Sequence, residues 1–277
     1  MFKIISDSSC DLNDKLKKLL NINIVPLNIQ VGNKNFLGVE SLSPQKIIGE
    51  MKKCLTSPKT SSPSPEKFIN AFKGIEKVFV VTLSSKLSST YNNAMLAKEI
   101  FLEDMGKKFI HVFDSKSASV GQTLVSMKIA EYIQQNLSEK IIVEKVNSYI
   151  DEMKTFFVLE SLDNLVKAGR ISKLKGKLAS TLSIKPIMKG NDLGEIELVK
   201  KVRGTKKALE KLIDIIESEG LNIEDKILGI THCNCLDRAL KFKEDVVKRL
   251  NFKDVIIVEA APISTVYANE GGIVIAF

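Results

Sequence analysis

Residues 155–172 read Thr-Phe-Phe-Val-Leu-Glu-Ser-Leu-Asp-Asn-Leu-Val-Lys-Ala-Gly-Arg-Ile-Ser and predict how the second half of the chain begins. The apolar run over 156–159 has the length of a strand, and the apolar residues after it recur at helical spacing. Gly169 is expected to end this helix, because glycine adopts the left-handed conformation of a helix C-terminus at little cost. Arg170 comes next, so we expect its side chain to be held at a fixed corner.

A β-hairpin is predicted over residues 184–201. The segment 184–188 is expected to be a short strand or a strand at a sheet edge, because Pro186 has no N–H to donate to a neighbouring strand. Residues 191–194, Asn-Asp-Leu-Gly, have the composition of a turn, and a second strand over 195–201 follows them. Taken by itself, this arrangement fits a purely structural junction as well as a functional one.

The first half of the chain repeats a strand, a polar loop and a helix. Strands are expected at residues 1–5, 22–31, 78–83 and 109–113, and polar loops begin at Ser6, Thr60, Ser84 and Asp114. Asp11 is interpreted as the N-cap of the first helix, and Ser43-Pro44 as the start of the next. This repeat predicts a largely parallel sheet with helices on both faces, in which ligands bind at the carboxyl-end loops.

The second half is also α/β in pattern, but the hairpin predicts a mixed sheet. Helices are expected over 208–216 and 237–250, and strands over 227–230, 255–258 and after Gly271. We place a domain boundary near residue 160. The fold class is therefore α/β with two α/β domains, an N-terminal one over 1–160 and a C-terminal one over 161–277.

Composition places this 277-residue chain among ordinary globular proteins, with 44% apolar and 27% charged residues. No apolar run approaches the roughly 20 residues of a membrane span. The opening segment 1–5 is too short for a signal peptide, so we expect a cytoplasmic protein. The net charge is +8, but basic and acidic residues are interleaved. We therefore predict a lysine-rich surface and no nucleic-acid partner, with transient contact to a membrane surface left open.

No metal, cofactor or autonomous catalytic motif is predicted. The cysteines Cys10, Cys54, Cys233 and Cys235 are expected to be reduced in the cytoplasm. Residues 232–235, His-Cys-Asn-Cys, resemble half of a zinc site, but no second pair completes four ligands. The sequence lacks a Gly-x-Ser-x-Gly elbow and a P-loop, which argues against hydrolase and nucleotide chemistry in the chain itself.

Two hydroxyl-rich segments are candidates for an anion site. Ser88-Ser89-Thr90 stands where a loop enters a helix, so its hydroxyls and the free N–H groups of the first turn suit a carboxylate or phosphate. A simple helix N-cap explains the same residues. Thr60-Ser61-Ser62-Pro63 is either ordinary loop polarity or a second wall of the same pocket.

Several motifs resemble those of the DegV family of bacterial lipid-binding proteins, some of which are the fatty-acid-binding subunit of fatty acid kinase. They are Leu-x-x-Leu-x-x-Ala-Gly-Arg-Ile-Ser over 162–172, Ile-Lys-Pro-Ile over 184–187 and Lys-Val-Arg-Gly over 201–204. Segments 6–12, 59–65 and 83–91 and the closing Gly-Gly follow in family order, so the resemblance covers nearly the whole chain.

The resemblance implies a fatty-acid carboxylate held in a cleft between the two domains by loops of the first, with the acyl chain in an apolar tunnel covered by the second. The ligand-binding positions that it implies are Thr60, Ser61, Ser88, Ser89, Thr90, Arg170 and Tyr267. Ser62, Ser89 and Ala168 depart from the family pattern. Tyr267 stands where the family has a headgroup-binding histidine, so it is either a neutral hydrogen-bond donor or a residue packed at the hinge.

On this interpretation the chain carries a long-chain fatty acid and presents its carboxylate to the ATP-binding subunit of a fatty acid kinase. Arg203 is the residue that the resemblance places toward that subunit. Two alternatives remain open. One is a free-standing phosphotransferase or hydrolase on the same fold, and the other is a nucleic-acid-binding or regulatory protein, which the net charge alone suggests.

Overall fold

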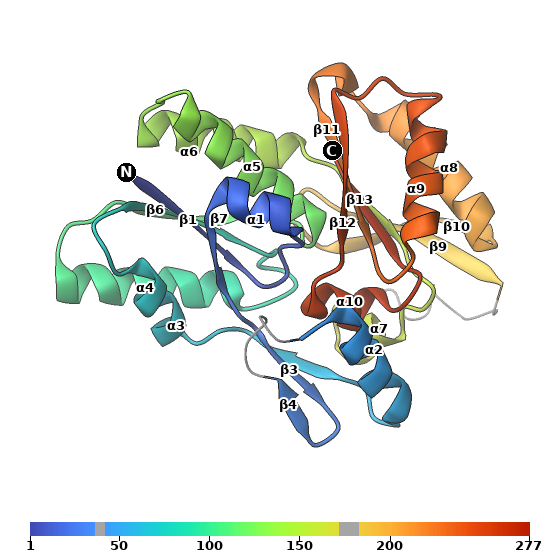
Figure 1. The fold of residues 1–277 in the computed structure, drawn as a ribbon, viewed down its shortest axis with the longest axis horizontal. Coiled ribbons are helices and arrows are strands. Elements are labelled where there is room, and N and C mark those ends of the chain that lie inside the picture. The colour runs from blue at the N-terminus through green and yellow to red at the C-terminus, as the bar shows by residue number, and fades with distance from the viewer. Residues whose placement is uncertain (37–41, 172–182) are drawn as a thin grey trace.

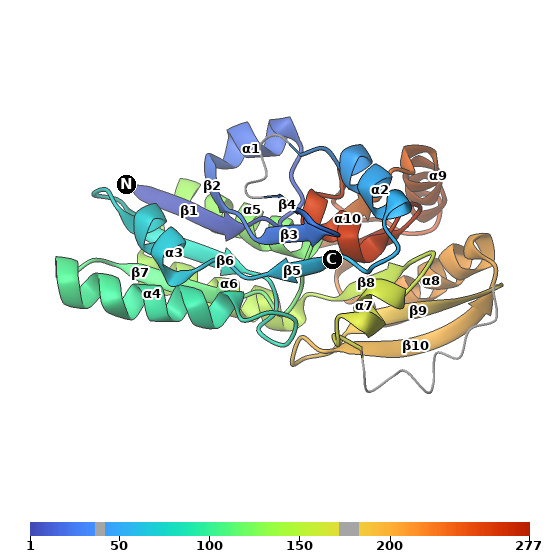
Figure 2. The same cartoon turned by 90° about the horizontal axis from the view of Figure 1, so that it is seen from below.

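The computed structural model describes residues 1–36, 42–171 and 183–277, which form two main β-sheets joined by a shared helix (Figure 1, Figure 2). The smaller of these sheets has the strand order β2-β1-β6-β7 and is parallel throughout. Its strands are β1 (Phe2–Asp7), β2 (Ile22–Val25), β6 (Lys77–Thr82) and β7 (Ile110–Asp114). The carboxyl ends of β1, β6 and β7 therefore open toward one edge, where a ligand site is expected.

Helices cover both faces of the parallel sheet. α3 (Pro65–Phe72) and α4 (Thr90–Met105) pack on one face, and α5 (Val120–Gln134) and α6 (Glu139–Glu152) on the other. In β6, Val80 belongs to the first of these clusters and Phe79 to the second, and both side chains are fully buried. The predicted parallel sheet with helices on both faces is confirmed.

The larger sheet has the order β10-β9-β8-β13-β11-β12 and is mixed, because β11 and β12 are parallel while the other pairs are antiparallel. Its strands are β8 (Thr155–Val158), β9 (Ile184–Gly190), β10 (Ile196–Arg203), β11 (Ile227–His232), β12 (Asp254–Glu259) and β13 (Ile273–Ala276). α8 (Thr205–Glu219) and α9 (Leu236–Val247) cover one face, and a 3-10 turn (Ile223–Asp225) precedes β11. The predicted mixed sheet with its hairpin is confirmed.

α5 connects the two sheets, because it contacts β1 and β6 of one and β11 and β13 of the other. Val120 and Leu124 of this helix pack against Val258 and Ala276. The remaining face of the larger sheet packs on α7 (Asp163–Lys167) and α10 (Pro262–Ala268). β8 belongs to the larger sheet although it precedes residue 160, and the domain boundary proposed there stays a prediction.

The expectation of a short or edge strand at 184–188 is wrong. β9 extends to Gly190 and lies between β8 and β10. Pro186 is tolerated because β8 pairs with β9 only over Ile187–Lys189, so no strand of the sheet continues beside the proline on that side. On its other side Pro186 lies opposite Lys201 of β10.

A third sheet and one helix were not predicted. Residues 22–31 form two strands rather than one, because the chain leaves β2 at Pro26 and enters β3 (Asn28–Val31). β3 pairs with β4 (Lys34–Phe36) and with β5 (Lys59–Ser61), which lies in a segment expected to be a loop. α2 (Pro44–Lys53) begins at Ser43 as predicted, with the Ser43 hydroxyl accepting from Lys46 N, and it packs beside the unpredicted α10.

The interpretation of Asp11 as the N-cap of the first helix is wrong. α1 (Asp14–Leu20) is capped by Asn13, whose side chain accepts a hydrogen bond from Leu16 N at 2.9 Å. Asp11 is fully buried instead, because its carboxylate accepts hydrogen bonds from β11, from the start of α10 and from the loop before α5.

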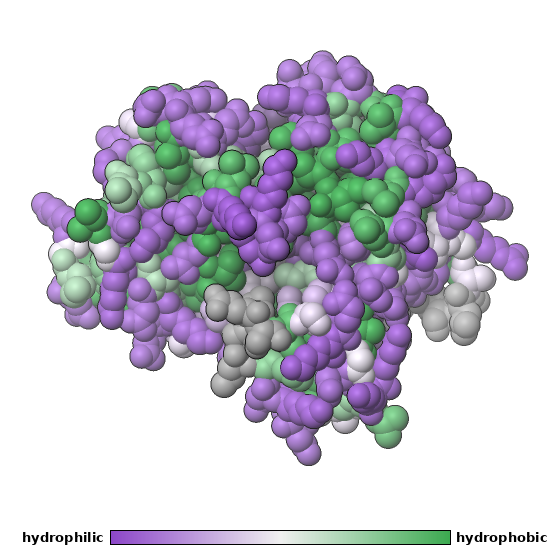
Figure 3. Space-filling view, viewed as in Figure 1, coloured by the Kyte–Doolittle hydropathy of each residue, from purple (hydrophilic) through white to green (hydrophobic). Residues whose placement is uncertain are grey.

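One face of the molecule is largely hydrophilic (Figure 3). Hydrophilic side chains cover much of the face drawn in Figure 3, with apolar side chains gathered mainly toward its middle. Within the described ranges, we find no helix with both the length and the apolar character needed to cross a bilayer.

Candidate functional site

A pocket lies between the two main sheets, at the carboxyl ends of β1, β6 and β7. The loops after these strands contribute Ser9, Leu83 and residues 116–119, and the larger sheet contributes residues of β8, β9, β10 and β13. The wall is mostly apolar, with side chains of Leu27, Leu83, Leu87, Phe157, Leu159, Leu165, Ile196, Ile263 and Val274. The cavity has a volume of about 130 Å³. One water needs about 10–15 Å³ by this measure, so the pocket is far larger than a single-water cavity.

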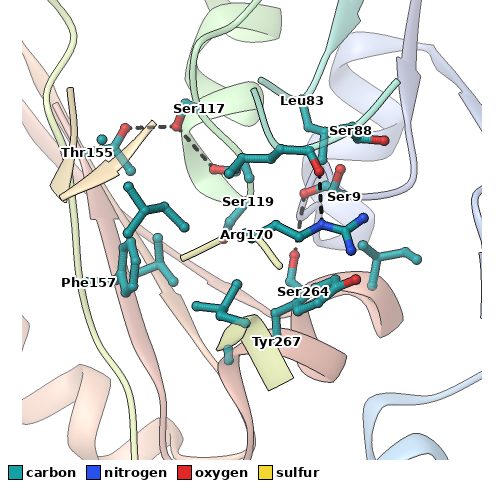
Figure 4. A pocket seen from close by; sticks show the side chains of 18 of the residues that line it. Ser9, Leu83, Ser88, Ser117, Ser119, Thr155, Phe157, Arg170, Ser264 and Tyr267 are labelled. Atoms are coloured by element: carbon teal, nitrogen blue, oxygen red, sulfur yellow. Dashed lines mark hydrogen bonds between the residues drawn. The ribbon is translucent and has the colours of Figure 1, made fainter. Parts of the chain in front are cut away.

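One end of the pocket is polar. Ser88, Arg170 and Tyr267 lie together on one side of Figure 4, while Thr155 and Phe157 lie on the other. Thr60 also lines the pocket, and its hydroxyl is 2.6 Å from the Tyr267 hydroxyl, although these residues are 207 positions apart. Hydroxyls of this kind donate to an anionic oxygen and accept from one another, so the pair suits a carboxylate headgroup.

Arg170 is fixed by the helix ending that precedes it. Gly169 has φ of 80° and follows α7, with Gly169 N bonded to Val166 O and Arg170 N bonded to Leu165 O, both at 3.0 Å. This pair of bonds is the Schellman ending, which glycine favours. The Arg170 side chain then donates from Nε to Leu87 O at 3.0 Å and from Nη1 to Ala168 O at 2.8 Å. Its guanidinium carbon lies 5.7 Å from the centre of the Tyr267 ring.

Three of the residues that the resemblance placed at the ligand do not line the pocket. Thr60 and Ser61 are neighbours on β5 and point to opposite faces of that strand, so Ser61 is exposed and bonds with Asn28 at 3.1 Å. The Ser89 hydroxyl bonds with Ser62 at 2.8 Å. Thr90 is fully buried, with its hydroxyl 2.8 Å from that of Ser88, which does line the pocket.

The opposite end of the pocket is closed by the β9–β10 hairpin. Gly190 and Gly194, on either side of the hairpin turn, both line the wall, and the Ser84 hydroxyl donates to Gly194 O at 2.8 Å. Beside them the Ser117 and Thr155 hydroxyls are 2.8 Å apart and satisfy each other. Among the described residues that line this end, Lys116 is charged, and its Nζ lies 2.7 Å from Asp151. One end of the pocket thus carries Arg170 with a cluster of hydroxyls, and at the other end the polar side chains are paired with one another or with Asp151.

A family model described as "Uncharacterised protein, DegV family" matches residues 1–277. The chain belongs to the DegV family. A DegV domain-containing protein of Streptococcus pneumoniae is 34% identical over 278 residues, covering 100% of this chain and 98% of the relative. These matches confirm the resemblance seen in the sequence.

Solved structures of DegV-family proteins are similar over the whole length. A protein from Ruminococcus gnavus, whose crystal structure contains vaccenic acid, is 40% identical with a TM-score of 0.96 and coverage of 100% and 99% of the two chains. The fatty acid kinase (Fak) B3 protein of Streptococcus pneumoniae, loaded with linoleic acid, is 32% identical with a TM-score of 0.91 and the same coverage.

Arg203 lies apart from the pocket in this DegV-family chain. It is the last residue of β10, its side chain is exposed, and it precedes Gly204 and the start of α8. The structure thus leaves Arg203 accessible to another molecule. Ser172, the last residue of the Arg-Ile-Ser motif, lies outside the described residues.

The structure also brings together polar residues that the sequence analysis did not assign to a site. Ser9, Ser117, Ser119 and Ser264 line the pocket, and Asp11 lies behind this wall. Burial raises the pKa of Asp11 to about 6, and the hydrogen bonds from Ser119, Ala261 N, Ser264 and Thr231 act against that rise. These residues come from four separate segments, so no local pattern could have grouped them.

No group of three or more His, Cys, Asp or Glu side chains that could hold a metal ion occurs within 1–36, 42–171 and 183–277. His232, from the half-site considered above, accepts a hydrogen bond at Nδ1 from Cys235 N at 3.4 Å. Burial lowers the pKa of His232 and raises that of Cys233 to about 12, so the neutral forms of both are favoured.

Proposed function

We propose that this chain binds a long-chain fatty acid in the pocket between its sheets, with the carboxylate at the Arg170 end. The observation that carries this proposal is the guanidinium and hydroxyl cluster at one end of an otherwise apolar pocket. A carboxylate there gains charge-assisted hydrogen bonds. Each methylene buried along the apolar wall adds about 0.8 kcal/mol. The vaccenic and linoleic acids in the two similar structures support this assignment.

We further propose that the chain is a carrier subunit rather than a free-standing enzyme. It would present the carboxylate to a separate ATP-binding kinase subunit, where a carboxylate oxygen attacks the γ-phosphorus of ATP, ADP leaves and an acyl phosphate forms. The likeness to a fatty acid kinase B3 protein supports this role. The proposed headgroup residues are Ser88, Arg170 and Tyr267, which lie at one end of the pocket in Figure 4, and Thr60, whose hydroxyl contacts that of Tyr267.

Mass spectrometry of the purified protein tests the binding function directly. Native spectra are expected to show a mass increment of one long-chain fatty acid per chain, since a water-filled apolar pocket of this kind is unfavourable. Solvent extraction of the same sample then identifies acyl length and unsaturation. Protein that is empty on purification and takes up no oleic acid from lipid vesicles would contradict the proposal.

The carrier role is tested by reconstitution. Oleate-loaded protein and ATP are expected to yield no acyl phosphate until a fatty acid kinase ATP-binding subunit is added, with ADP release and hydroxylamine trapping as the two readouts. Acyl phosphate formation or ester hydrolysis by the chain alone would favour the free-standing enzyme instead.

Tyr267→Phe is expected to weaken oleic acid binding by roughly five- to tenfold, because the neutral hydroxyl donor is lost while the ring is kept. The Kd is measured by titration of delipidated protein. Ser61→Ala is the matched control, since it also deletes one hydroxyl but from an exposed side chain outside the pocket. Equal affinities for wild type and Tyr267→Phe would assign Tyr267 to packing rather than to the headgroup.

Arg203→Ala is expected to leave oleic acid affinity unchanged and to slow acyl phosphate formation by about tenfold at limiting kinase subunit. The reason is that an exposed charge at the rim of an interface acts mainly on association. Lys107→Ala, which removes an exposed cation just after α4, is the control and is expected to have no effect. A loss of fatty-acid affinity in Arg203→Ala would instead place this residue at the ligand.

A further inference from the structure

Asp11 links the two sheets through its carboxylate. It follows β1 of the parallel sheet and is fully buried. Its Oδ1 accepts from Ala261 N and from the Ser264 hydroxyl, both at 2.7 Å. Its Oδ2 accepts from the Thr231 hydroxyl at 3.0 Å and from the Ser119 hydroxyl. Four donors from three other segments therefore converge on one side chain.

Two of these donors belong to the first turn of α10, which has no cap of its own. The N-cap residue is Ala261, which offers no side-chain hydrogen bond, and Pro262 follows it. An acidic side chain at a helix start satisfies free N–H groups and is favoured by the helix dipole. Asp11 supplies this contact across 250 positions of sequence. It acts as the missing cap of α10.

The position of α10 decides where part of the headgroup site lies. Ile263, Ser264, Tyr267 and Ala268 of this helix all line the pocket. Ser264 bonds to Asp11, and Tyr267 lies three positions further along, close to the same side of the helix. Figure 4 shows both side chains rising from α10 beside Arg170. A shift of the first turn would therefore move the Tyr267 hydroxyl away from Thr60.

The loop on the other side of Asp11 is held in an unusual conformation. Ser119 has φ of 61° and ψ of −134°, a backbone region that residues other than glycine rarely adopt. The contacts that hold it there include Ser119 N to Ser9 O at 3.0 Å, the Ser119 hydroxyl to Asp11, and the same hydroxyl to that of Thr231 at 2.9 Å. Strained conformations of this kind persist where the surroundings over-determine them and are frequent at ligand sites. Asp11 thus fixes two walls of the pocket.

We propose that Asp11 is a positioning residue for the fatty-acid headgroup, acting through its hydrogen bonds to the first turn of α10, which place the Tyr267 hydroxyl at the ligand carboxylate. The inference rests on the proposed function. An ionised carboxylate is an acceptor only, which is what four converging donors require. With the pKa of Asp11 near 6, this form predominates at pH 7.5.

A double-mutant cycle tests this inference, because residues that act through one element have coupled effects. Oleic acid affinity is measured at pH 7.5 for wild type, Asp11→Asn, Tyr267→Phe and the double variant. Asn keeps the size of the side chain but has one acceptor oxygen and presents an amide to the remaining donors. We expect about a tenfold loss in each single variant and about a tenfold loss, not a hundredfold loss, in the double variant.

A second pair of variants keeps the test decisive if Asp11→Asn does not fold. Ser264→Ala and Thr231→Val each delete one hydroxyl that donates to Asp11, the first from α10 and the second from β11. We expect Ser264→Ala to be coupled to Tyr267→Phe and Thr231→Val to be additive with it.

The outcomes separate the inference from the proposed function. The positioning role would be overturned if the losses of affinity in the single variants multiply in the double variants Asp11→Asn/Tyr267→Phe and Ser264→Ala/Tyr267→Phe. Wild-type affinity in Asp11→Asn would overturn it as well. Either result would leave fatty-acid binding intact. A wild-type protein that binds no oleic acid would overturn both.

Discussion

Gly190→Leu is expected to weaken oleic acid binding on the order of a hundredfold while leaving the binding of dodecanoic acid nearly unchanged. Gly190 is the last residue of β9 and lines the end of the pocket opposite Arg170. A Cβ added there would have Lys116 O at 3.7 Å and Thr155 Cβ at 3.9 Å as its nearest neighbours, which are ordinary contacts. The further carbons of leucine must then extend into the space that we assign to the end of the acyl chain. Displacing three or four methylenes at about 0.8 kcal/mol each gives this magnitude.

Gly190→Ala is the graded control for this prediction. Its methyl group fits without displacing a neighbour, so we expect less than a fivefold loss for oleic acid and an unchanged thermal midpoint. Titration with saturated acids of increasing length should show the optimum of Gly190→Leu moving to shorter chains. Retained dodecanoic acid binding shows that the variant is folded. If Gly190→Leu binds oleic acid as tightly as wild type does, the acyl chain ends elsewhere.

The features that the sequence predicted well are those decided by neighbouring residues. The helix expected to follow Ser88-Ser89-Thr90 is present as α4, and Ser43 caps α2 as its Ser-Pro pair indicates. Gly169 ends α7 and so fixes the backbone at Arg170. In each case the deciding interaction lies within a few positions of the residue, so periodicity and cap chemistry are sufficient to find it.

The features that the sequence did not predict depend on partners far along the chain. Asp11 is a residue type that commonly caps a helix, but its carboxylate accepts hydrogen bonds from α10 and β11, more than 200 positions away. β5 exists because β3 is available to pair with it, and nothing within Lys59–Ser61 signals a strand. Tyr267 entered the candidate site only through its place in the family pattern, and its contact with Thr60 spans 207 positions.

Arg170→Met is expected to weaken oleic acid binding by roughly a hundredfold. Methionine keeps much of the apolar stem of arginine but removes the guanidinium, which is the cation at the headgroup end of the pocket. A charge-assisted hydrogen bond to a carboxylate contributes about 1.5–3 kcal/mol. The loss is larger than for Tyr267→Phe because a charged donor is removed rather than a neutral one.

Arg170→Lys separates the charge of this side chain from its shape. Lysine keeps a positive charge but lacks the planar fork that donates to Leu87 O and Ala168 O at once. If charge dominates, Arg170→Lys should recover most of the affinity, and if the fixed orientation dominates, it should resemble Arg170→Met. We expect an intermediate loss of about tenfold, because the carboxylate needs a positive charge and also needs that charge to be held in a fixed orientation. Methyl oleate, which has no negative charge, should bind to Arg170→Met and to wild type with almost equal affinity. A large difference between the two affinities would show that Arg170 acts on the acyl chain instead of the headgroup.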